Sequence, residues 1–435
     1  MQDLLCQNVG VNADGILTFA GQDTVELAAR YGTPLYLMDE DRIRHNCRAY
    51  LSAVHSAFGE GGRVLYASKA SSFKRMYELM REEGMGIDVV SVGEMTTALR
   101  ADYPLENAYF HSNNKTDADI VFAMEHGIGH FVVDNEEELF AIEREAALRD
   151  VRQPILLRIT PGIDPHTFEA VSTGKVDSKF GFAIETGAAE DIIVKALSLP
   201  HIQLDGLHCH VGSQVFDATV FLLTADVMLS FIAEMQTRHA FTVREFDIGG
   251  GFGVRYLPTD PVLDLPACIK QIADFMKQKA ADLGIALPRI AFEPGRSIVA
   301  DAGMTLYTVG NVKCIPEFIN YVSVDGGMTD NVRYAMYGAP YTVLQANAMA
   351  APHDMTCTVV GRCCESGDII QPNVQLPQTI KRGDTVAVLT TGAYHYSMAS
   401  NYNRIPRPPI VMLKDGTSYV AVRRETPEAL VSLDV

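Results

Sequence analysis

The spacing of hydrophobic positions changes along the chain at about residue 39. Before that point, short apolar stretches separated by turns predict strands over 15–19 and 34–38. Between 39 and 303, short apolar runs alternate with longer segments of helical spacing, which is typical of repeated strand–helix units in a parallel sheet. After 304 the helical segments become rare, and Val- and Thr-rich runs bounded by turn residues predict an all-β region.

The middle region has room for a full set of barrel strands. The candidate strands are 63–67, 86–90, 108–111, 130–134, 155–160, 202–211, 243–248 and 289–293. Helical patterns lie between them, at 71–83, 93–101, 117–126, 135–149, 186–198, 218–238 and 263–283. About eight such units in about 250 residues fit a closed (β/α)8 barrel better than an open sheet. We therefore predict an α/β protein with a TIM-like barrel over 39–303 and a separate all-β domain over 304–435, completed by the N-terminal strands in 1–38.

The composition narrows the class of protein. The chain has 435 residues, of which 47% are hydrophobic and 21% charged, so it is long enough for two globular domains. Its formal net charge of -18 argues against a nucleic-acid partner, because such binding needs clustered Lys and Arg. We see no secretory signal, no apolar run long enough to cross a bilayer and no C-x-x-C among the 8 cysteines. We expect a cytoplasmic protein with reduced thiols and no membrane partner.

Chemistry in such a barrel lies at the carboxyl ends of its strands. These ends carry Lys69, Asp88, the His-Ser-Asn-Asn segment 111–114, Arg158, 208–213, 247–253 and 293–297. Lys69 directly follows the first strand. An ammonium at the end of a buried strand is poorly hydrated, so we expect its pKa to fall and its amine to be nucleophilic. The alternative is a lysine that pairs with a carboxylate.

Two glycine-bearing loops follow the last two strands. Glycines at 249–251 let backbone N–H groups approach an anion, and Gly295 with Arg296 supplies a second loop whose guanidinium suits a phosphate. Glu293 beside these loops needs a cationic partner, either Arg296 or a protonated ring nitrogen. A phosphate, a ring nitrogen and a nucleophilic lysine together indicate pyridoxal 5′-phosphate.

Other polar clusters leave alternatives open. His208 and His210 are two apart on a predicted strand, so both rings face one side, where they could bind a metal or stack on a cofactor. Asp205 and His111 are possible third ligands, although we predict no metal. The 363–368 segment, Cys-Cys-Glu-Ser-Gly-Asp, is either a buried turn or the source of an acidic thiol.

The motifs match those of a known family. They are Tyr-Ala-Ser-Lys at 66–69, His-Cys-His-Val-Gly-Ser-Gln at 208–214, Asp-Ile-Gly-Gly-Gly at 247–251, Glu-Pro-Gly-Arg at 293–296, Cys-Glu-Ser at 364–366 and Gly-Ala-Tyr at 392–394. In this order they resemble the pyridoxal-phosphate-dependent decarboxylases of the alanine-racemase fold, fold type III. Within that family the resemblance is greatest to the branch that acts on diaminopimelate, also over residues 160–181.

The resemblance implies roles for the matching residues. Lys69 would bind the cofactor covalently, His210 would stack on its ring and Glu293 would hold the ring nitrogen. The phosphate would be held by Ser213, Gly251, Gly295, Arg296 and Tyr394, with Asp88 and Arg158 as supporting residues. Substrate contacts would come from Arg296, Arg333, Tyr337, Glu365 and Tyr394. In the family the catalytic cysteine comes from the second subunit, so Cys364 and Glu365 would act in trans across a homodimer interface.

The implied reaction is decarboxylation of meso-2,6-diaminopimelate to L-lysine and CO2, the last step of lysine biosynthesis. A distal ammonium suits Glu365 and a distal carboxylate suits Arg333. Arg362 and Pro340 depart from the family pattern near the substrate-binding residues. The alternatives are a decarboxylase of D-ornithine, D-lysine or arginine, a non-catalytic relative, a racemase of the same fold and a metal-dependent hydrolase.

Overall fold

The computed structural model describes residues 4–163 and 178–435, so the 164–177 part of the family-like segment lies outside the described residues. The chain divides into two compact units. The barrel unit comprises Asn46–Gly253 and Val262–Gly295, and the β unit comprises Met1–His45, Val254–Pro261 and Arg296–Val435. The segments 39–45, 254–261 and 296–303, which the sequence predictions assign to the barrel, group with the β unit.

The barrel unit is built on parallel strands that close on themselves. The strands are β5 (Gly62–Ala67), β6 (Gly86–Val89), β7 (Ala108–Phe110), β8 (His130–Val133), β9 (Gln153–Thr160), β11 (Ile202–His208), β12 (Glu245–Asp247) and β13 (Arg289–Phe292). Each pairs in parallel with the next, β8 pairs with β9, and β13 returns to pair with β5. The short β10 (Phe182–Ala183) adds to β9 outside the ring. The predicted closed barrel is therefore confirmed, and all its carboxyl ends lie at one end.

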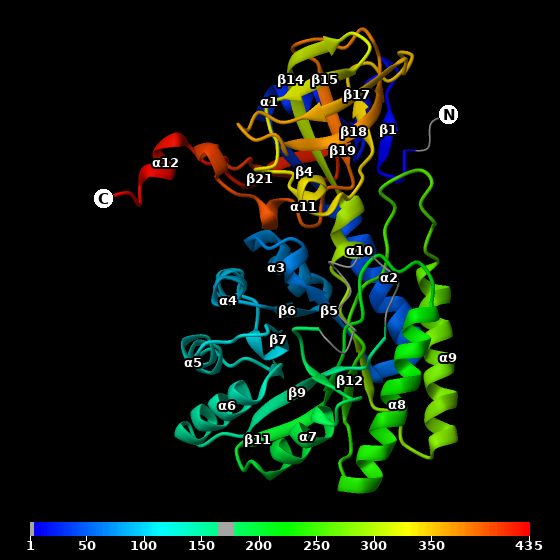
Figure 1. Ribbon diagram of the computed structural model, residues 1–435, viewed down its shortest axis with the longest axis vertical. Coiled ribbons are helices and arrows are strands. Elements are labelled where there is room, and N and C mark those ends of the chain that lie inside the picture. The colour runs from blue at the N-terminus through cyan, green and yellow to red at the C-terminus, as the bar shows by residue number, and fades with distance from the viewer. Residues whose placement is uncertain (1–3, 164–177) are drawn as a thin grey trace. The chain divides into compact units, whose positions relative to one another are not determined.

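Helices cover the outside of these strands (Figure 1). They are α3 (Lys74–Glu83), α4 (Val92–Arg100), α5 (Asp117–Glu125), α6 (Glu136–Leu148), α7 (Ala188–Ser198), α8 (Thr219–His239) and α9 (Leu265–Leu283). Local sequence explains several helix ends. Thr116 and Asp119 form a reciprocal capping box at the start of α5, and Gly84 ends α3 in the left-handed conformation.

From the sequence we expected no segment long and apolar enough to cross a membrane. By length and composition alone, helix α8 meets that condition. Its most apolar window is 44% buried inside the structure, and the helix packs against α9. A core helix of a water-soluble domain passes the same test, since a helix covered on several sides is apolar around much of its surface. Its burial gives α8 the character of a core helix of the barrel unit.

The β unit contains a large mixed sheet. Its strand order is β18-β17-β15-β14-β4-β20-β21, and β19 joins β14 and β16. The strands are β4 (Leu35–Asp39), β14 (Gly303–Ile315), β15 (Ile319–Val324), β16 (Val343–Gln345), β17 (Met355–Val360), β18 (Ile369–Leu376), β19 (Thr385–Leu389), β20 (Ile410–Lys414) and β21 (Thr417–Val422). Because β4 lies between β14 and β20, N-terminal residues complete this domain, as predicted.

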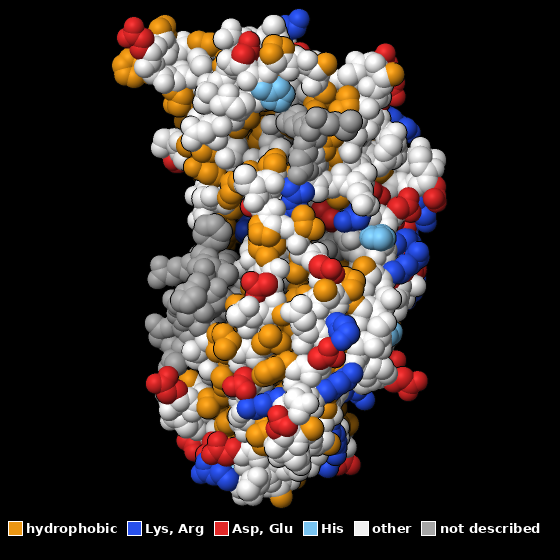
Figure 2. Space-filling view, turned by 90° about the vertical axis from the view of Figure 1, so that its right-hand side faces the viewer, with side chains coloured by type: hydrophobic (Ala, Val, Ile, Leu, Met, Phe, Trp, Pro, Cys, Tyr) orange, Lys and Arg blue, Asp and Glu red, His pale blue; other side chains and the backbone are white. Residues whose placement is uncertain are grey.

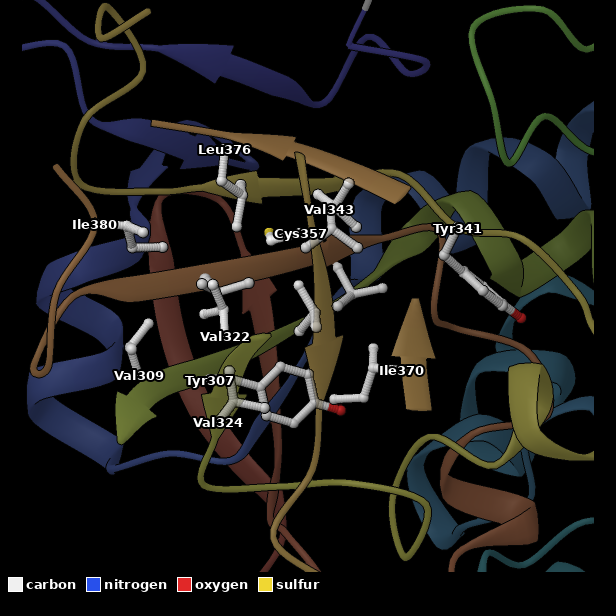
Figure 3. Packing of buried hydrophobic residues seen from close by; sticks show 14 of the residues in the cluster. Tyr307, Val309, Val322, Val324, Tyr341, Val343, Cys357, Ile370, Leu376 and Ile380 are labelled. Atoms are coloured by element: carbon white, nitrogen blue, oxygen red, sulfur yellow. The ribbon is translucent and has the colours of Figure 1, made fainter. Parts of the chain in front are cut away.

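The core of the β unit consists of residues that alternate along these strands. Val322 and Val324 from β15 face the interior with Tyr307 and Val309 from β14 (Figure 3). Alternation buries one side of each strand, which is the sequence pattern that predicts a strand. Pro372 lies within β18 and interrupts its apolar run, so this strand is less apparent from the sequence than its neighbours.

The N-terminal segment differs from the prediction of strands and turns alone. Strands β1 (Val9–Val11), β2 (Leu17–Phe19) and β3 (Gln22–Asp23) form a small sheet, but Thr24–Tyr31 is a helix, α1. The Asp23 carboxylate accepts hydrogen bonds from the N–H groups of Val25 and Glu26, which is a strong N-cap. The remaining helices are α2 (Glu40–Phe58), α10 (Arg296–Val299), α11 (Arg333–Tyr337) and α12 (Pro427–Val431).

The chain has more acidic than basic residues, but its surface is not uniformly acidic. On the face shown in Figure 2, acidic and basic side chains are interspersed with hydrophobic ones. Such mixing keeps local fields small even where the net charge is high.

Candidate active site

The loop after β12 is shaped by close backbone packing. A Cβ on Gly249 would lie 2.6 Å from the Cys209 carbonyl oxygen, and one on Gly250 would overlap the carbonyl oxygen of Glu293. Gly251 has φ +116°, and its Cβ would overlap the carbonyl oxygen of Gly212. These glycines therefore let the loop lie directly against the loop after β11 and the end of β13. The resulting run of backbone N–H groups has the form of an anion-binding cradle.

The loop after β13 packs closely against the end of β5. A Cβ on Gly295 would lie 2.8 Å from the Cβ of Ala67, and the Ala67 N–H donates to the Pro294 carbonyl at 3.2 Å. Ala67 is the last residue of β5 and precedes Lys69 by two positions. Gly295 therefore brings the loop that follows Glu293 next to the backbone that carries Lys69.

Glu293 is buried and has a histidine on each carboxylate oxygen. His111 Nε2 lies 2.7 Å from Oε1, and His208 Nε2 is hydrogen-bonded to Oε2 at 3.0 Å. Burial alone would raise the pKa of Glu293, but the two histidines hold it well below its usual range. Burial lowers the pKa of His208 to about 4, so this ring is neutral at neutral pH. Glu293 is therefore an ionised carboxylate held between two imidazole rings.

Two further carboxyl groups lie near Glu293. Burial and the charge of Glu293 raise the pKa of Asp88 to about 6 and raise that of Asp247 well above its usual range. Asp247 also accepts a hydrogen bond from the Gly249 N–H at 2.8 Å, which ties the end of β12 to the glycine loop. Glu293 is therefore the most readily ionised of these three carboxyl groups.

Lys69 lies in a short 3-10 helix after β5, between the buried residues Ser68 and Ala70. Its side chain is exposed, so the desolvation that the sequence led us to expect is absent. The strand ends two residues before Lys69, which lets the chain turn the lysine outward. The carboxyl groups of Asp88 and Glu94 interact electrostatically with the Lys69 side chain. The amine is thus accessible to a reacting carbonyl.

His210 contacts the glycine loop, whereas His208 contacts Glu293. Strand β11 ends at His208, so the alternation argument does not extend to His210 in the following loop. His210 Nδ1 accepts a hydrogen bond from the Gly250 N–H at 3.3 Å, and burial lowers the pKa of His210 well below its usual value. Ser213 and Gly251 follow on the same two loops. A neutral imidazole fixed over the glycine loop suits stacking on a flat ring.

Arg158 lies in β9, and its guanidinium stacks on the ring of Phe180 at 4.2 Å from the centroid. Its Nε lies 3.8 Å from Asp134 Oδ1. Burial lowers the pKa of Arg158, and the nearby Asp134 opposes that shift. Arg158 therefore places a positive charge among the carboxyl ends of the barrel strands.

The barrel residues fit pyridoxal phosphate. Lys69 offers an exposed amine, Glu293 an ionised carboxylate for a ring nitrogen, and the glycine loop a cradle that any Cβ would fill. His111, His208 and Glu293 also form a set of metal-type donors within 4.8 Å of one another. Asp205, considered above as a ligand, instead contacts His130 at 3.2 Å.

A second group of predicted residues lies in the β unit, around Arg296. Its guanidinium donates to the Tyr256 hydroxyl at 2.6 Å and lies over the ring of Tyr394, 4.8 Å from the centroid. Tyr394 has φ +64°, an uncommon conformation for a tyrosine, which directs its side chain at this arginine. Tyr256 was missed from the sequence, because only folding brings the 254–261 segment into the β unit.

Arg333 is buried at the start of α11 and belongs to the same group. It lies over the ring of Tyr337 at 4.6 Å and over that of Tyr394 at 5.3 Å. Tyr341, also missed from the sequence, interacts with the guanidinium through its hydroxyl. Two arginines thus share the ring of Tyr394, and they form a cationic, aromatic-lined group suited to carboxylate or phosphate recognition.

Cys364 and Glu365 have exposed side chains in the 361–368 loop. The Cys364 N–H donates to Asn403 Oδ1 at 2.8 Å. The buried Asp368 fixes the loop through hydrogen bonds to backbone N–H groups. Asp368 accepts from the N–H groups of Met328 at 2.6 Å and Cys363 at 2.7 Å. Burial and Asp368 raise the pKa of Cys363 to about 11. The loop therefore presents Cys364, rather than Cys363, to the surroundings.

Comparison with known proteins assigns the class. Residues 40–300 match the family described as "Pyridoxal-dependent decarboxylase, pyridoxal binding domain". The chain belongs to the pyridoxal-dependent decarboxylases, and pyridoxal phosphate is its cofactor. This confirms the resemblance and the cofactor drawn from the motifs.

Full-length relatives place the chain within that family. It is 45% identical to the diaminopimelate decarboxylase of Bacillus subtilis over 424 residues, which cover 98% of this chain and 96% of the relative. The diaminopimelate decarboxylase of M. jannaschii, solved with L-lysine, has a TM-score of 0.90 at 31% identity and covers 99% of this chain and 98% of its own. A lysine/ornithine decarboxylase from Vibrio vulnificus, solved with putrescine, has a TM-score of 0.75 at 25% identity and covers 93% and 99%. These matches place the chain among the diaminopimelate decarboxylases.

Proposed function

We propose that this protein decarboxylates meso-2,6-diaminopimelate to L-lysine and CO2, the last step of lysine biosynthesis. The observation that carries the proposal is the ionised Glu293 at the carboxyl end of the barrel strands. Racemases of this fold favour an arginine at that position, because an arginine does not keep the ring nitrogen protonated. A carboxylate supports a strong electron sink, which decarboxylation requires.

The family resemblance names the residues that would hold the cofactor. Lys69 would bind its aldehyde, Glu293 would hold its ring nitrogen and His210 would cover the face of its ring, with Asp88 and Arg158 in support. Its phosphate would be held by Ser213, Gly251, Gly295, Arg296 and Tyr394. The cradle of the glycine loop and the Arg296–Tyr394 contact support this assignment. When bound, pyridoxal phosphate withdraws electrons from the substrate α-carbon, so that the α-carboxylate can leave as CO2.

Residues of this chain carry the remaining steps. Lys69 would hold the cofactor covalently while no substrate is bound, and its amine would serve to release the product. Glu293 stays ionised throughout and stabilises the positive charge of the ring nitrogen. The Cys364 thiol donates its proton to the α-carbon in place of CO2, which balances the reaction. The thiolate that forms regains its proton from solvent.

Substrate choice is assigned to the β unit. Arg333 pairs with the distal carboxylate, aided by Arg296, Tyr337 and Tyr394, and Glu365 pairs with the distal ammonium. The exposed side chains of Cys364 and Glu365 support action on the active site of a second copy. The functional form is then a homodimer in the cytoplasm, in which each subunit completes the site of the other.

Incubation with meso-diaminopimelate, with CO2 and L-lysine as readouts, tests this function. A panel of D-ornithine, D-lysine and arginine is the control, because a lysine/ornithine decarboxylase is among the similar structures. CO2 from a panel member and none from diaminopimelate would replace the proposed substrate. Lys69→Ala must lose both turnover and the near-ultraviolet band of the covalently bound cofactor.

A further inference from the structure

His111 is a buried polar residue to which the reaction above gives no role. It follows β7 and opens the His-Ser-Asn-Asn-Lys segment 111–115, and its N–H donates to the Val89 carbonyl at 2.8 Å. That backbone bond ties the end of β7 to β6 and fixes the direction of the side chain. The imidazole then reaches Glu293 Oε1 at 2.7 Å, although the two residues are far apart in sequence.

His208, the last residue of β11, contacts the same carboxylate. Its Nε2 contacts Oε2 at 3.0 Å, and the rings of His111 and His208 meet edge to face with centroids 4.8 Å apart. Each ring therefore restrains the other while both contact Glu293. Because a carboxylate has about four lone-pair sites, both oxygens keep capacity for another donor.

The charges around Glu293 show what these contacts do. Asp88 and Asp247 are buried beside it, and Lys69 and Arg158 are the nearby cations. Three carboxyls in one buried region repel one another when they are ionised. Neither Asp88 nor Asp247 has a histidine contact like those of Glu293 among the described hydrogen bonds and ion pairs. The two histidine contacts thus make Glu293 the carboxyl that is held most firmly in its ionised form.

We propose that His111 and His208 are positioning residues, which hold Glu293 ionised and oriented toward the ring nitrogen of the cofactor. This inference rests on the proposed function, since it takes Glu293 as the partner of that nitrogen. Imidazoles suit this role, because a ring N–H can donate a hydrogen bond to each carboxylate oxygen. Without them the carboxylate takes up the proton and the ring nitrogen loses it.

The test observes the ring nitrogen directly. The holoenzyme is prepared with cofactor labelled with 15N in the ring, and its NMR shift distinguishes a protonated from an unprotonated nitrogen. In the wild type we expect the protonated position at neutral pH. In His111→Leu and in His208→Leu we expect a shift toward the unprotonated position and about ten- to hundredfold weaker cofactor binding, as for loss of a hydrogen bond to a charged group.

Three further variants separate positioning from general stability. His111→Gln keeps an N–H donor at about the place of Nε2 and should restore the protonated position. The Asn side chain of His111→Asn is polar but too short to reach Glu293, so this variant should give the same nitrogen shift as His111→Leu. It replaces His111→Leu in the test if that variant does not fold. His130→Leu removes another histidine–carboxylate contact, 3.2 Å from Asp205, at the start of β8. It should leave the nitrogen shift unchanged.

The outcomes are distinct. A folded His111→Leu or His111→Asn holoenzyme with the wild-type nitrogen shift overturns the positioning role while the proposed function stands. An unprotonated nitrogen in the wild type overturns the assignment of Glu293, and this inference with it. Cofactor-free protein is followed by thermal unfolding, so that a loss of fold is recognised before the spectra are compared.

Discussion

The α-carbon of Gly250 packs directly against the carbonyl oxygen of Glu293. A methyl group added at Gly250 would overlap that oxygen, and backbone atoms on both sides leave no flexible side chain to move aside. The N–H of Glu293 also donates to the Gly249 carbonyl at 3.0 Å. The glycine loop and the acid are therefore one rigid backbone unit, and the position of one sets that of the other.

Gly250→Ala is expected to displace this loop. Overpacking of this kind costs about 1–3 kcal/mol of unfolding free energy, and we expect at least about tenfold weaker cofactor binding. Urea unfolding and cofactor titration measure the two effects. Gly61→Ala is the matched control, because a Cβ there meets nothing within 4 Å. Equal behaviour of the two variants would show that the close approach does not matter.

Mixed dimers test the action of Cys364 in trans. Lys69→Ala and Cys364→Ala should each be inactive alone. Random reassociation of the two variants places one intact site in each mixed dimer, so about a quarter of the wild-type sites should return. Turnover of diaminopimelate after subunit exchange is the measurement. If no activity returns although mixed dimers are detected by mass, the cysteine acts within its own subunit.

Arg333→Leu tests recognition of the distal carboxylate. Loss of a charge-assisted contact predicts a fall of about ten- to hundredfold in kcat/KM for diaminopimelate. Binding of the cofactor should change little, because Arg333 is assigned to the substrate. The exposed Arg382 is the control position, and Arg382→Leu should match the wild type. A large loss of cofactor affinity in Arg333→Leu would assign this arginine to the phosphate instead.

The lysine of the 111–115 segment has a structural role that predicts a stability effect. Lys115 Nζ is buried and contacts Glu138 and the Val132 carbonyl, each at 2.8 Å. Glu138→Gln leaves this ammonium without its counter-charge, which should lower the unfolding free energy by about 3–5 kcal/mol. Urea unfolding provides the measurement.

An exposed ion pair is the control for this variant. Glu136 contacts Lys195 at 2.8 Å, and both side chains are largely in solvent. Glu136→Gln should change stability by at most about 1 kcal/mol, because exposed ion pairs contribute little. Similar losses in the two variants would mean that burial does not set the strength of the Lys115 contact.

His395 predicts acid sensitivity of the β unit. Burial lowers its pKa to about 3, whereas an unfolded histidine has a pKa of about 6.5. Between these values the unfolded state binds the extra proton, so stability falls as pH decreases, by up to about 1.4 kcal/mol per pH unit. In His395→Phe this contribution disappears, and the curve of unfolding free energy between about pH 6.5 and 4 should be flatter.

Chemical unfolding across this pH range measures the slope for both proteins. His126 is exposed, so His126→Phe serves as a control that should retain the wild-type slope. Parallel curves for His395→Phe and the wild type would contradict the burial of a neutral imidazole at 395.

The sequence by itself determined the alternation of strands and helices, the closed barrel, the β domain with its N-terminal strand and the cofactor class. These follow from local periodicity, from glycine spacing and from motif order, all of which are written along the chain. It also predicted Lys69, Glu293 and the glycine loops as residues of the site. The helix Thr24–Tyr31 was missed, although its N-cap at Asp23 is a local signal that the sequence contains. Barrel closure alone brought His111 and His208 onto Glu293, and folding of the β unit alone brought Tyr256 to Arg296. Such contacts depend on which strand ends become neighbours in space, and no local pattern of residues records that.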